Sequence, residues 1–214
     1  MSERTSDGSS DPTTAKVYDQ AYFDRWYRNS GTRVKHSATM ARKINMIVAV
    51  TEHYLERPLR SVLDVGCGEG VFGEAITQLR PNCHYLGLDS SEYAIERFGM
   101  KRNLRLLDFG ALAQQRFDRS YDLLICSDVM HYLPNKTLVA GLSGFDELCH
   151  GLGFFEVFCR GDEFVGDLDG FMFRNASWYR RVFHEAGFVP LGSHFYLSPS
   201  MRGAATRLEL AQSS

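Results

Sequence analysis

The cysteines of this sequence lack the spacing that metal or redox chemistry requires. The 214 residues hold five cysteines, and no two of them stand at the C-x-x-C spacing of a zinc or redox site. The five are Cys67, Cys83, Cys126, Cys149 and Cys159. This spacing predicts no metal site. We expect the cysteines that lie in apolar runs to be small buried hydrophobic residues in a reducing compartment.

An excess of charge and long hydrophobic runs are also missing. Lysine and arginine number 24 against 26 aspartates and glutamates, a formal net charge of −2, which disfavours a generally basic surface for nucleic acid. Apolar runs such as 47–50 are only a few residues long, so no segment is expected to cross a bilayer. Residues 1–10 lack the apolar core of a signal peptide, and we expect a cytoplasmic protein.

Length and composition fit a single domain that follows a short tail. Residues 1–14 are mostly Ser, Thr, Asp, Gly and Pro; they cannot offset the entropy of ordering and are predicted to be disordered. A hydrophobic fraction of 44% suits one globular domain over residues 15–214. Within it we expect a helical part at 15–57 and a sheet-forming part at 58–214.

Helical spacing of apolar residues predicts two helices before the first strand. Aromatic side chains recur at helical spacing over 16–29, which predicts a helix with an aromatic face. The residues of this face are Tyr18, Tyr22, Phe23, Trp26 and Tyr27. Gly31 ends this helix, and a second amphipathic helix is predicted over 32–56, closed by Pro58.

From residue 58 onward, short apolar strands alternate with amphipathic helices. Strands are predicted at 61–65, 84–88, 104–107, 121–126 and 154–158. Helices are predicted at 71–79, 91–98, 134–149 and 177–186. This alternation indicates an α/β fold with a doubly wound, mostly parallel sheet that is covered on both faces. The segments 188–197 and 205–210 are expected to pair as antiparallel strands at one edge.

A glycine-rich turn follows the first predicted strand, with the sequence Asp64-Val65-Gly66-Cys67-Gly68-Glu69-Gly70. Ligands of such sheets bind at the carboxyl ends of the strands, beside this turn. Residues 68–73 also fit the G-x-G-x-x-G fingerprint of dinucleotide enzymes, with Asp89 downstream. Carboxylates at Asp64 and Glu69 would repel a pyrophosphate and attract the ammonium and sulfonium groups of S-adenosylmethionine. The turn therefore favours S-adenosylmethionine and leaves NAD as the alternative.

Five segments in order over residues 60–160 resemble the motifs of class I S-adenosylmethionine-dependent methyltransferases. They are 62–70, 87–89, 108–109, 121–133 and 151–156. The resemblance implies a Rossmann-like sheet of seven mostly parallel strands that ends in an antiparallel hairpin. It also implies S-adenosylmethionine as cofactor, with S-adenosylhomocysteine as its product.

The same resemblance implies which residues hold the cofactor. They are Asp64, Gly66, Cys67, Gly68, Asp89, Ser90, Asp108, Phe109, Ser127, Asp128 and Val129. Asp89 would bind the ribose hydroxyls, although it could also cap the helix that follows. Asp108 and Phe109 correspond to the adenine-binding step, and the segment that includes Asp128 borders the methyl group.

The fourth predicted strand leads into candidate catalytic residues. No N/D-P-P-F/Y tetrapeptide follows it, and residues 127–130 resemble the small-molecule branch of the family instead. A hydroxyl or ammonium acceptor must lose a proton, for which histidine is the usual agent near neutral pH. His131 is therefore a candidate general base, with Tyr132 beside it. The alternatives for His131 are a wall of the cofactor or substrate pocket, or a structural role.

The helical part at 15–57 is a candidate lid that covers the acceptor and excludes water. The candidate substrate-binding residues are Tyr18, Tyr22, Trp26, Arg33 and Tyr132. The alternative is that the aromatic face only packs on the sheet. The basic stretch 25–43, which holds Arg33, could anchor an anionic group or could be a solvated helix face. The acidic segment 161–170 could pair with that stretch or hold an amine.

The sequence thus predicts an S-adenosylmethionine-dependent methyltransferase (EC 2.1.1.-) that acts on a small molecule, with anionic compounds among the candidates. One alternative is an RNA or protein methyltransferase with the same cofactor site. Another is a non-catalytic regulatory module that binds S-adenosylmethionine or NAD. A single short basic segment gives little support for nucleic acid as a partner. The methyl acceptor and the oligomeric state are left open.

Overall fold

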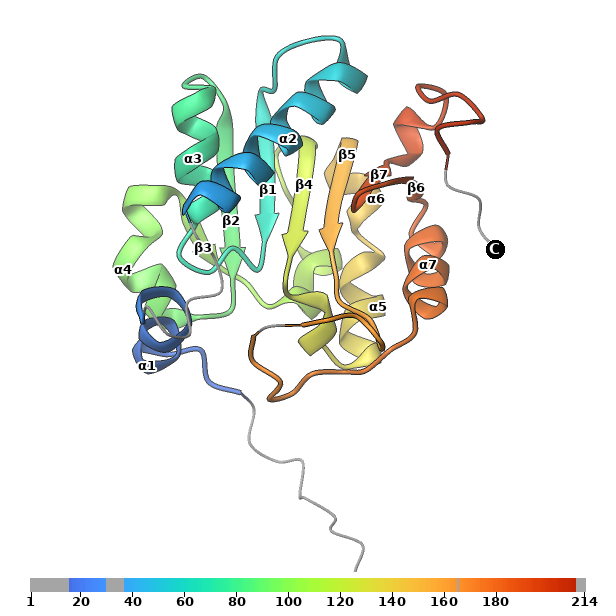
Figure 1. Cartoon of the computed structure of the whole chain (residues 1–214). Helices are drawn as coiled ribbons and strands as arrows, with labels where there is room; N and C mark the ends of the chain where they lie inside the picture. The colour runs from blue at the N-terminus through green and yellow to red at the C-terminus, as the bar shows by residue number, and fades with distance from the viewer. Residues whose placement is uncertain (1–15, 30–36, 165, 211–214) are drawn as a thin grey trace, which may run out of the picture.

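A seven-stranded sheet lies at the centre of the computed structural model, which describes residues 16–29, 37–164 and 166–210 (Figure 1). The strands are β1 (Ser61–Val65), β2 (His84–Asp89), β3 (Leu104–Leu106), β4 (Tyr121–Ser127), β5 (Cys149–Glu156), β6 (Val189–Gly192) and β7 (Phe195–Leu197). Their order is β3-β2-β1-β4-β5-β7-β6. The first five strands are parallel, and β7 runs antiparallel to β5 and β6. The predicted fold class is confirmed.

Helices cover both faces of this sheet (Figure 1). The α-helices are α1 (Gln20–Phe23), α2 (Ser37–Leu55), α3 (Val71–Leu79), α4 (Glu92–Arg102), α5 (Asn135–Leu142), α6 (Phe145–Leu148) and α7 (Ala176–Glu185). Shorter helical turns are η1 (Asp24–Arg28), η2 (Phe109–Gln114), η3 (Met130–Tyr132) and η4 (Pro199–Met201). Ile47 of α2 and Ile76 of α3 are buried on one face, and Phe145 of α6 and Phe183 of α7 on the other. The sheet therefore has a hydrophobic core on each side, as a doubly wound fold requires.

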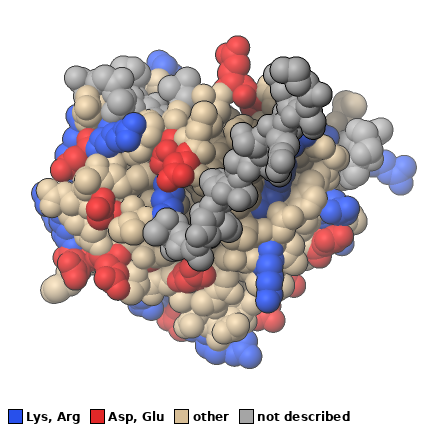
Figure 2. Space-filling view, turned by 90° about the horizontal axis from the view of Figure 1, so that it is seen from below, with Lys and Arg blue, Asp and Glu red and all other residues tan. Residues whose placement is uncertain are grey.

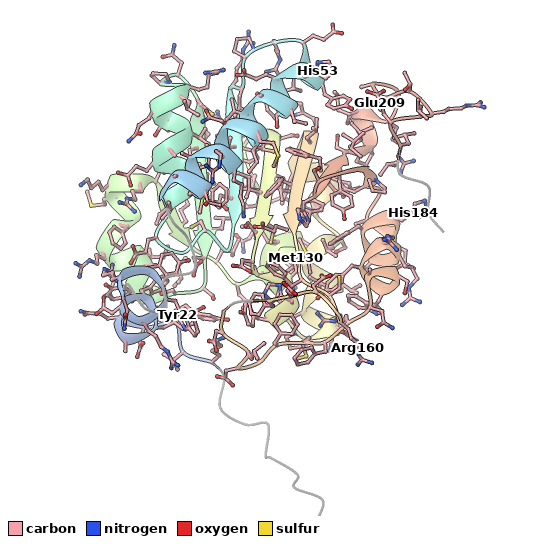
Figure 3. The ribbon with its side chains drawn as sticks, in the orientation of Figure 1. Tyr22, His53, Met130, Arg160, His184 and Glu209 are labelled. Carbon is pink, nitrogen blue, oxygen red and sulfur yellow. The ribbon has the colours of Figure 1, made fainter. Side chains whose placement is uncertain are left out.

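The two ends of the sheet differ in what closes them. Tyr22 and Met130 lie toward the carboxyl ends of the parallel strands, and His53 and Glu209 toward the amino ends (Figure 3). At the amino end the buried carboxylate of Asp122 accepts two hydrogen bonds from Arg57, at 2.6 and 2.9 Å, and lies 2.8 Å from His150. Burial raises the pKa of Asp122, but the hydrogen bonds from Arg57, the Arg60 N–H and His150, together with the charge of Arg57, outweigh burial and hold the pKa below its usual value. This end of the sheet is thus closed by charge pairs, whereas the carboxyl end carries the cavity described below.

The N-terminal helix is shorter than its aromatic spacing predicts. α1 begins at Gln20 rather than at residue 16, because the Asp19 carboxylate accepts a hydrogen bond from the Tyr22 N–H at 3.0 Å and caps the helix there. The chain then widens into the π-helical turn η1. The second helix is described from Ser37 onward. The predicted tail at 1–14, the start of that helix at 32–36 and Arg33 lie outside the described residues.

Two predictions for the second half of the chain are wrong. The helix predicted over 134–149 breaks after Leu142, and β5 begins at Cys149 rather than at residue 154. Gly151 weakens the strand pattern, yet it is required, since a Cβ there would lie 1.9 Å from the Asp122 carbonyl oxygen of β4. The hairpin is formed by β6 and β7, both within the predicted strand 188–197.

Positive φ angles at Ser193 and His194 allow the turn between β6 and β7. Residues 205–210, which we expected to form the second strand of the hairpin, form turns instead. None of the described helices is long and apolar enough to cross a membrane.

Candidate active site

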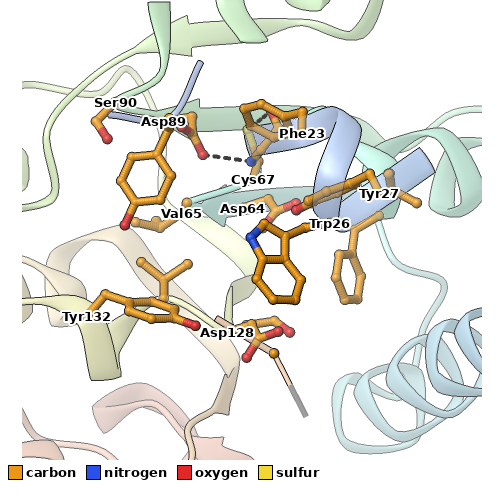
Figure 4. Close-up of a pocket in the computed structure, with 18 of the residues that line it drawn as sticks. Phe23, Trp26, Tyr27, Asp64, Val65, Cys67, Asp89, Ser90, Asp128 and Tyr132 are labelled. Carbon is orange, nitrogen blue, oxygen red and sulfur yellow. Dashed lines mark hydrogen bonds between the residues drawn. The ribbon is translucent and has the colours of Figure 1, made fainter. Parts of the chain in front are cut away.

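A cavity of about 530 Å³ lies at the carboxyl ends of β1, β2 and β4, bordered by α1 and η1 (Figure 4). Every residue that the motifs proposed for cofactor binding lines it: Asp64, Gly66, Cys67, Gly68, Asp89, Ser90, Asp108, Phe109, Ser127, Asp128 and Val129. Four of the five candidate substrate residues also line it, namely Tyr18, Tyr22, Trp26 and Tyr132. The volume is typical of a pocket for a small organic ligand.

The glycine turn lets the backbone fold tightly beside this cavity. The N–H groups of Gly66 and Cys67 both donate to the Leu88 carbonyl, at 2.7 and 3.0 Å. Gly66 has a φ of +73°, and a Cβ there would lie 2.3 Å from a methyl group of Val129. Gly68 has a φ of +53°, and a Cβ there would meet the Tyr27 hydroxyl at 3.0 Å. Both positions therefore need glycine.

Asp89 connects the end of β2 to the glycine turn. One carboxylate oxygen accepts a hydrogen bond from the Gly68 N–H at 2.7 Å (Figure 4), and the other accepts from the Ser91 N–H at 2.8 Å. Burial raises the pKa of this carboxyl, and the hydrogen bonds from the backbone oppose that rise. Ser91, rather than Asp89, caps α4 through its hydroxyl. The Asp89 carboxylate is thus held in place, and each of its oxygens has a further lone pair for a ligand.

Asp64 is a buried carboxylate in the middle of the sheet, with 2% of its surface exposed. The Tyr85 hydroxyl donates a hydrogen bond to it at 2.7 Å. Burial and the nearby Asp64 charge raise the pKa of the Cys67 thiol well above its usual value. Cys67 is therefore a protonated, inert side chain, and its backbone is the part that shapes the turn.

The third strand ends in a turn that brings Asp108 and Phe109 to the cavity. Asp108 caps η2 by accepting a hydrogen bond from the Gly110 N–H at 2.7 Å. The Phe109 ring is 6% exposed and packs against Phe145 with a centroid distance of 5.6 Å. Phe109 thus belongs to the core as well as to the cavity wall.

The end of β4 is fixed by a carboxylate from β5. The Ser127 hydroxyl and the Lys43 ammonium both bond to Glu156, and the Asp128 N–H donates to the Glu156 carbonyl at 3.0 Å. Asp128 has a φ of +69°, which is rare for a residue with a side chain. This strained conformation directs Asp128 into the cavity, where it faces the same space as Trp26 (Figure 4).

His131, the candidate general base, is completely buried and is not among the residues that line the cavity. Its ring packs against Tyr132 at 4.4 Å and Phe171 at 4.7 Å between centroids. Burial lowers its pKa to about 4, with a further contribution from the charge of Lys16, so the ring is neutral near pH 7. Its Nε2 lies 3.6 Å from a carboxylate oxygen of Asp128. His131 is thus placed behind the cavity wall, in contact with a residue that lines it.

Two segments far apart in the sequence meet over the cavity. The Lys16 ammonium lies 2.6 Å from the Asp167 carboxylate and donates to the Asp169 carbonyl at 2.9 Å. The Ser91 hydroxyl donates a hydrogen bond to the Tyr18 carbonyl at 2.6 Å. The Tyr132 hydroxyl donates to the Asp167 carbonyl at 2.7 Å. The N-terminal segment and the loop after β5 therefore cover the site together.

The charge of the cavity wall has one sign in the part of the chain that the structure describes. The charged residues that line it are Asp64, Glu74, Asp89, Asp108, Asp128 and Asp167. By contrast, acidic and basic side chains are interspersed over the outer surface at this end of the molecule (Figure 2). The cavity therefore suits a ligand with positive charge.

Sequence reasoning missed Glu156 and Lys16 as parts of the site. Glu156 lies at the end of the resembling segment 151–156, but the sequence gives no sign that it bonds to β4. Lys16 precedes the aromatic face by two residues, and its partner Asp167 is 151 positions away. The acidic segment 161–170 was the available signal, but the partner of Asp167 is Lys16, which lies outside the basic stretch 25–43 with which we expected the segment to pair.

Comparison with known proteins agrees with the geometry. Residues 63–155 match a family model described as a methyltransferase domain. Over 115 residues the chain is 26% identical to the malonyl-[acyl-carrier protein] O-methyltransferase of Bacillus cereus, covering 53% of this chain and 39% of that protein. The chain thus spans about two fifths of the length of this curated relative.

Two solved structures share the fold over most of both chains. An S-adenosylmethionine-bound amino pentose methyltransferase from Micromonospora echinaspora superposes with a TM-score of 0.62 at 14% identity, covering 86% of this chain and 99% of that one. Magnesium protoporphyrin IX methyltransferase from Synechocystis, with bound S-adenosylhomocysteine, gives 0.58 at 18% identity, with 84% and 93% covered. Residues 63–155 therefore match the model of a methyltransferase domain, and the chain has the fold of these two solved methyltransferases.

Proposed function

We propose that this protein binds S-adenosylmethionine in the cavity and transfers its methyl group to a small-molecule acceptor. The observation that carries the proposal is the acidic wall around a glycine turn at the carboxyl ends of β1 and β2. A sulfonium cofactor is attracted by such a wall, whereas the pyrophosphate of NAD is repelled. The family match over residues 63–155 and the methyltransferase folds described above support it.

The residues of the cavity fit this cofactor part by part. Gly66 and Gly68 both line the cavity, and because they have no side chain the ligand can approach their backbone closely. Asp89 would accept hydrogen bonds from the ribose hydroxyls, and Asp108 would receive the adenine amine. Asp64 and Asp128 would supply the negative charge that faces the amino and sulfonium groups. When bound, the cofactor supplies an activated methyl group, and the chain supplies its orientation.

The N-terminal helical part completes the site as a lid. Tyr18, Tyr22 and Trp26 offer rings to an acceptor, and Tyr132 of η3 closes the same space. A cover is needed because an open sheet leaves its strand ends in water, and methyl transfer requires the acceptor to be held in line. Arg33 lies outside the described residues. The described residues of the cavity wall include no lysine or arginine that could bind an anionic acceptor.

His131 supports the wall rather than removing a proton in this proposal. It is fully buried and its pKa is lowered to about 4 by burial, which makes it a weak base. We expect His131→Ala to change kcat by less than about tenfold, with a larger effect on cofactor affinity through Asp128. A general base would instead lose about 10²–10⁴ in kcat with unchanged cofactor affinity. Steady-state kinetics and cofactor titration of the same variant separate the two roles.

Calorimetry tests the proposal directly. The full chain is titrated with S-adenosylmethionine, S-adenosylhomocysteine and NAD, and we expect binding of the first two only. A screen of small amines, phenols and carboxylic acids against a bulk RNA preparation, with labelled S-adenosylmethionine, then identifies the acceptor class. Binding of NAD alone would replace the proposal with a dinucleotide-binding function. Methyl transfer to RNA alone would move the acceptor to a different class.

A further inference from the structure

The ammonium group of Lys16 lies in a box of aromatic rings. Its Nζ is 4.2 Å from the Tyr132 ring centroid, 5.4 Å from that of Tyr22 and 5.5 Å from that of Tyr18. The Asp167 carboxylate completes the box at 2.6 Å. All three distances to the rings are within the range in which a cation is attracted by a π face. The Lys16 side chain is only 15% exposed, so these contacts are made largely away from water.

This box is part of the cavity wall and not a separate surface feature. Tyr18, Tyr22, Tyr132 and Asp167 all line the cavity. Lys16 itself is not among the residues that line the cavity, so its ammonium reaches the rings from outside the cavity. Burial raises the pKa of all three phenols, that of Tyr18 to about 12, and the rings therefore stay neutral.

The arrangement is more specific than an ion pair that holds two segments together. An ion pair that only joins two segments needs the Lys16 ammonium and the Asp167 carboxylate, and it needs no aromatic rings around the ammonium. Three aromatic faces around one ammonium are instead the way proteins recognise substituted ammonium ligands. Since the surrounding wall is acidic, the same space disfavours a carboxylate or phosphate group.

We propose that the box formed by Tyr18, Tyr22, Tyr132 and Asp167 is a receptor for an amine or a substituted ammonium group of the acceptor, and that Lys16 fills it until the acceptor displaces it. The proposal rests on the proposed function, because it assigns the acceptor side of that site. It names amines as the substrate class and Asp167 as the residue that selects positive charge.

The test uses tetramethylammonium chloride as the probe, because it carries the charge and size of the ligand class and cannot be methylated. Its binding to the full chain is measured by calorimetry at constant ionic strength. In Lys16→Met the box has lost its internal cation, and we expect at least fivefold tighter binding than in the unaltered protein. Lys101→Met, an exposed position on α4, is the matched control and should leave binding unchanged.

Two further variants locate the probe. Asp167→Asn and Tyr132→Leu, each combined with Lys16→Met, should bind tetramethylammonium at least fivefold more weakly than Lys16→Met alone. Saturating S-adenosylhomocysteine, which fills the proposed cofactor site, should change the affinity of Lys16→Met for tetramethylammonium by less than twofold. tert-Butanol, which has the same shape without the charge, should bind at least tenfold more weakly. Lys16→Gln repeats the comparison if the methionine variant does not stay in solution.

Three results would overturn the proposal. Equal binding to the unaltered protein and Lys16→Met would make the Lys16–Asp167 contact an ion pair that only joins two segments. Equal binding of tert-butanol would make the box a merely apolar space. Competition by S-adenosylhomocysteine would place the cation in the cofactor site. S-adenosylmethionine affinity is measured for every variant, so a failure of the box is distinguished from a failure of the proposed cofactor site.

Discussion

At the residue scale, Asp89 is the side chain on which the proposed cofactor contact depends most. Its two oxygens are fixed by the Gly68 and Ser91 N–H groups, so it is preorganised for ribose hydroxyls. Each charge-assisted hydrogen bond of this kind contributes roughly 1.5–3 kcal/mol. We expect Asp89→Ala to weaken S-adenosylmethionine binding at least tenfold, as measured by calorimetry. Asp89→Asn keeps the shape of the side chain and should retain an intermediate affinity; unchanged affinity in a folded Asp89→Ala protein contradicts the ribose assignment.

The burial of His131 predicts how the stability of the fold depends on pH, independently of any role in catalysis. Burial lowers its pKa from 6.5 to about 4, so the folded protein favours the neutral ring more than the unfolded chain does. The stability that this contributes is fully present above pH 6.5 and is lost as the pH falls toward 4. At pH 5 the loss is on the order of 2 kcal/mol.

Urea unfolding at pH 7.5 and pH 5 measures this loss. The unaltered protein should lose on the order of 2 kcal/mol more stability between the two values than His131→Gln, whose side chain does not titrate. His184→Gln is the matched control, since His184 lies on the exposed side of α7, and it should behave like the unaltered protein. An equal loss in the unaltered protein and His131→Gln would show that His131 is solvated.

At the scale of single elements, the turn between β1 and α3 needs a glycine at residue 66 for two reasons, the backbone conformation and the lack of space for a side chain. Gly66 has a left-handed backbone conformation, with a φ of +73°, which costs a residue that carries a Cβ roughly 1–2 kcal/mol. A Cβ there would also lie 2.3 Å from a methyl group of Val129. Gly66→Ala should therefore lower the free energy of unfolding by about 2–4 kcal/mol in urea titrations. Adding Val129→Ala removes the clashing methyl groups and should restore part of that loss. Purely additive effects of the two substitutions would show that no clash exists.

Most elements could be predicted from the sequence because local pattern and tertiary environment agree in them. The strand at 121–126 is apolar from Leu123 to Cys126 and is buried on both sides in the fold. The predictions that were wrong concern segments whose structure depends on contacts that the local pattern does not reveal. Gly151 weakens the pattern of β5, and only the closeness of β4 explains it. The side-chain cap at Asp19 makes the N-terminal helix begin later than the aromatic spacing suggests.

It was also predictable that the residues proposed to hold the cofactor lie together, whereas the proposed acceptor side was not predictable. The motifs at 62–70, 87–89, 108–109 and 121–133 are each local in sequence, and all their proposed cofactor-binding residues line the cavity. The acceptor side depends on Lys16 and Asp167, which are brought together only by the fold. His131 follows β4 directly, but sequence position alone does not tell that its ring turns away into an aromatic cluster.

At the scale of the whole molecule, the N-terminal segment is separate from the two cores. None of the described residues 16–29 belongs to either buried cluster, although Phe23 is itself 2% exposed. Phe23 packs instead against Tyr27 and Tyr93, at 5.2 and 5.6 Å between centroids. The segment thus rests on the mouth of the site and on the start of α4, and its removal leaves the packing of the sheet complete.

Deleting residues 1–30 therefore tests the lid. The truncated protein should fold, with a thermal midpoint within about 5 °C of the full chain, because a loss of 1 kcal/mol shifts a domain of this size by only a few degrees. S-adenosylmethionine affinity should fall by no more than a few fold, since Asp64, Asp89 and the glycine turn remain. Methyl transfer should be lost, because Tyr18 and Tyr22 no longer hold the acceptor in line. Deleting only residues 1–14 is the control and should preserve activity. Failure of the truncated chain to fold would assign the aromatic face to the core, and normal methyl transfer would assign the lid to the loop after β5 alone.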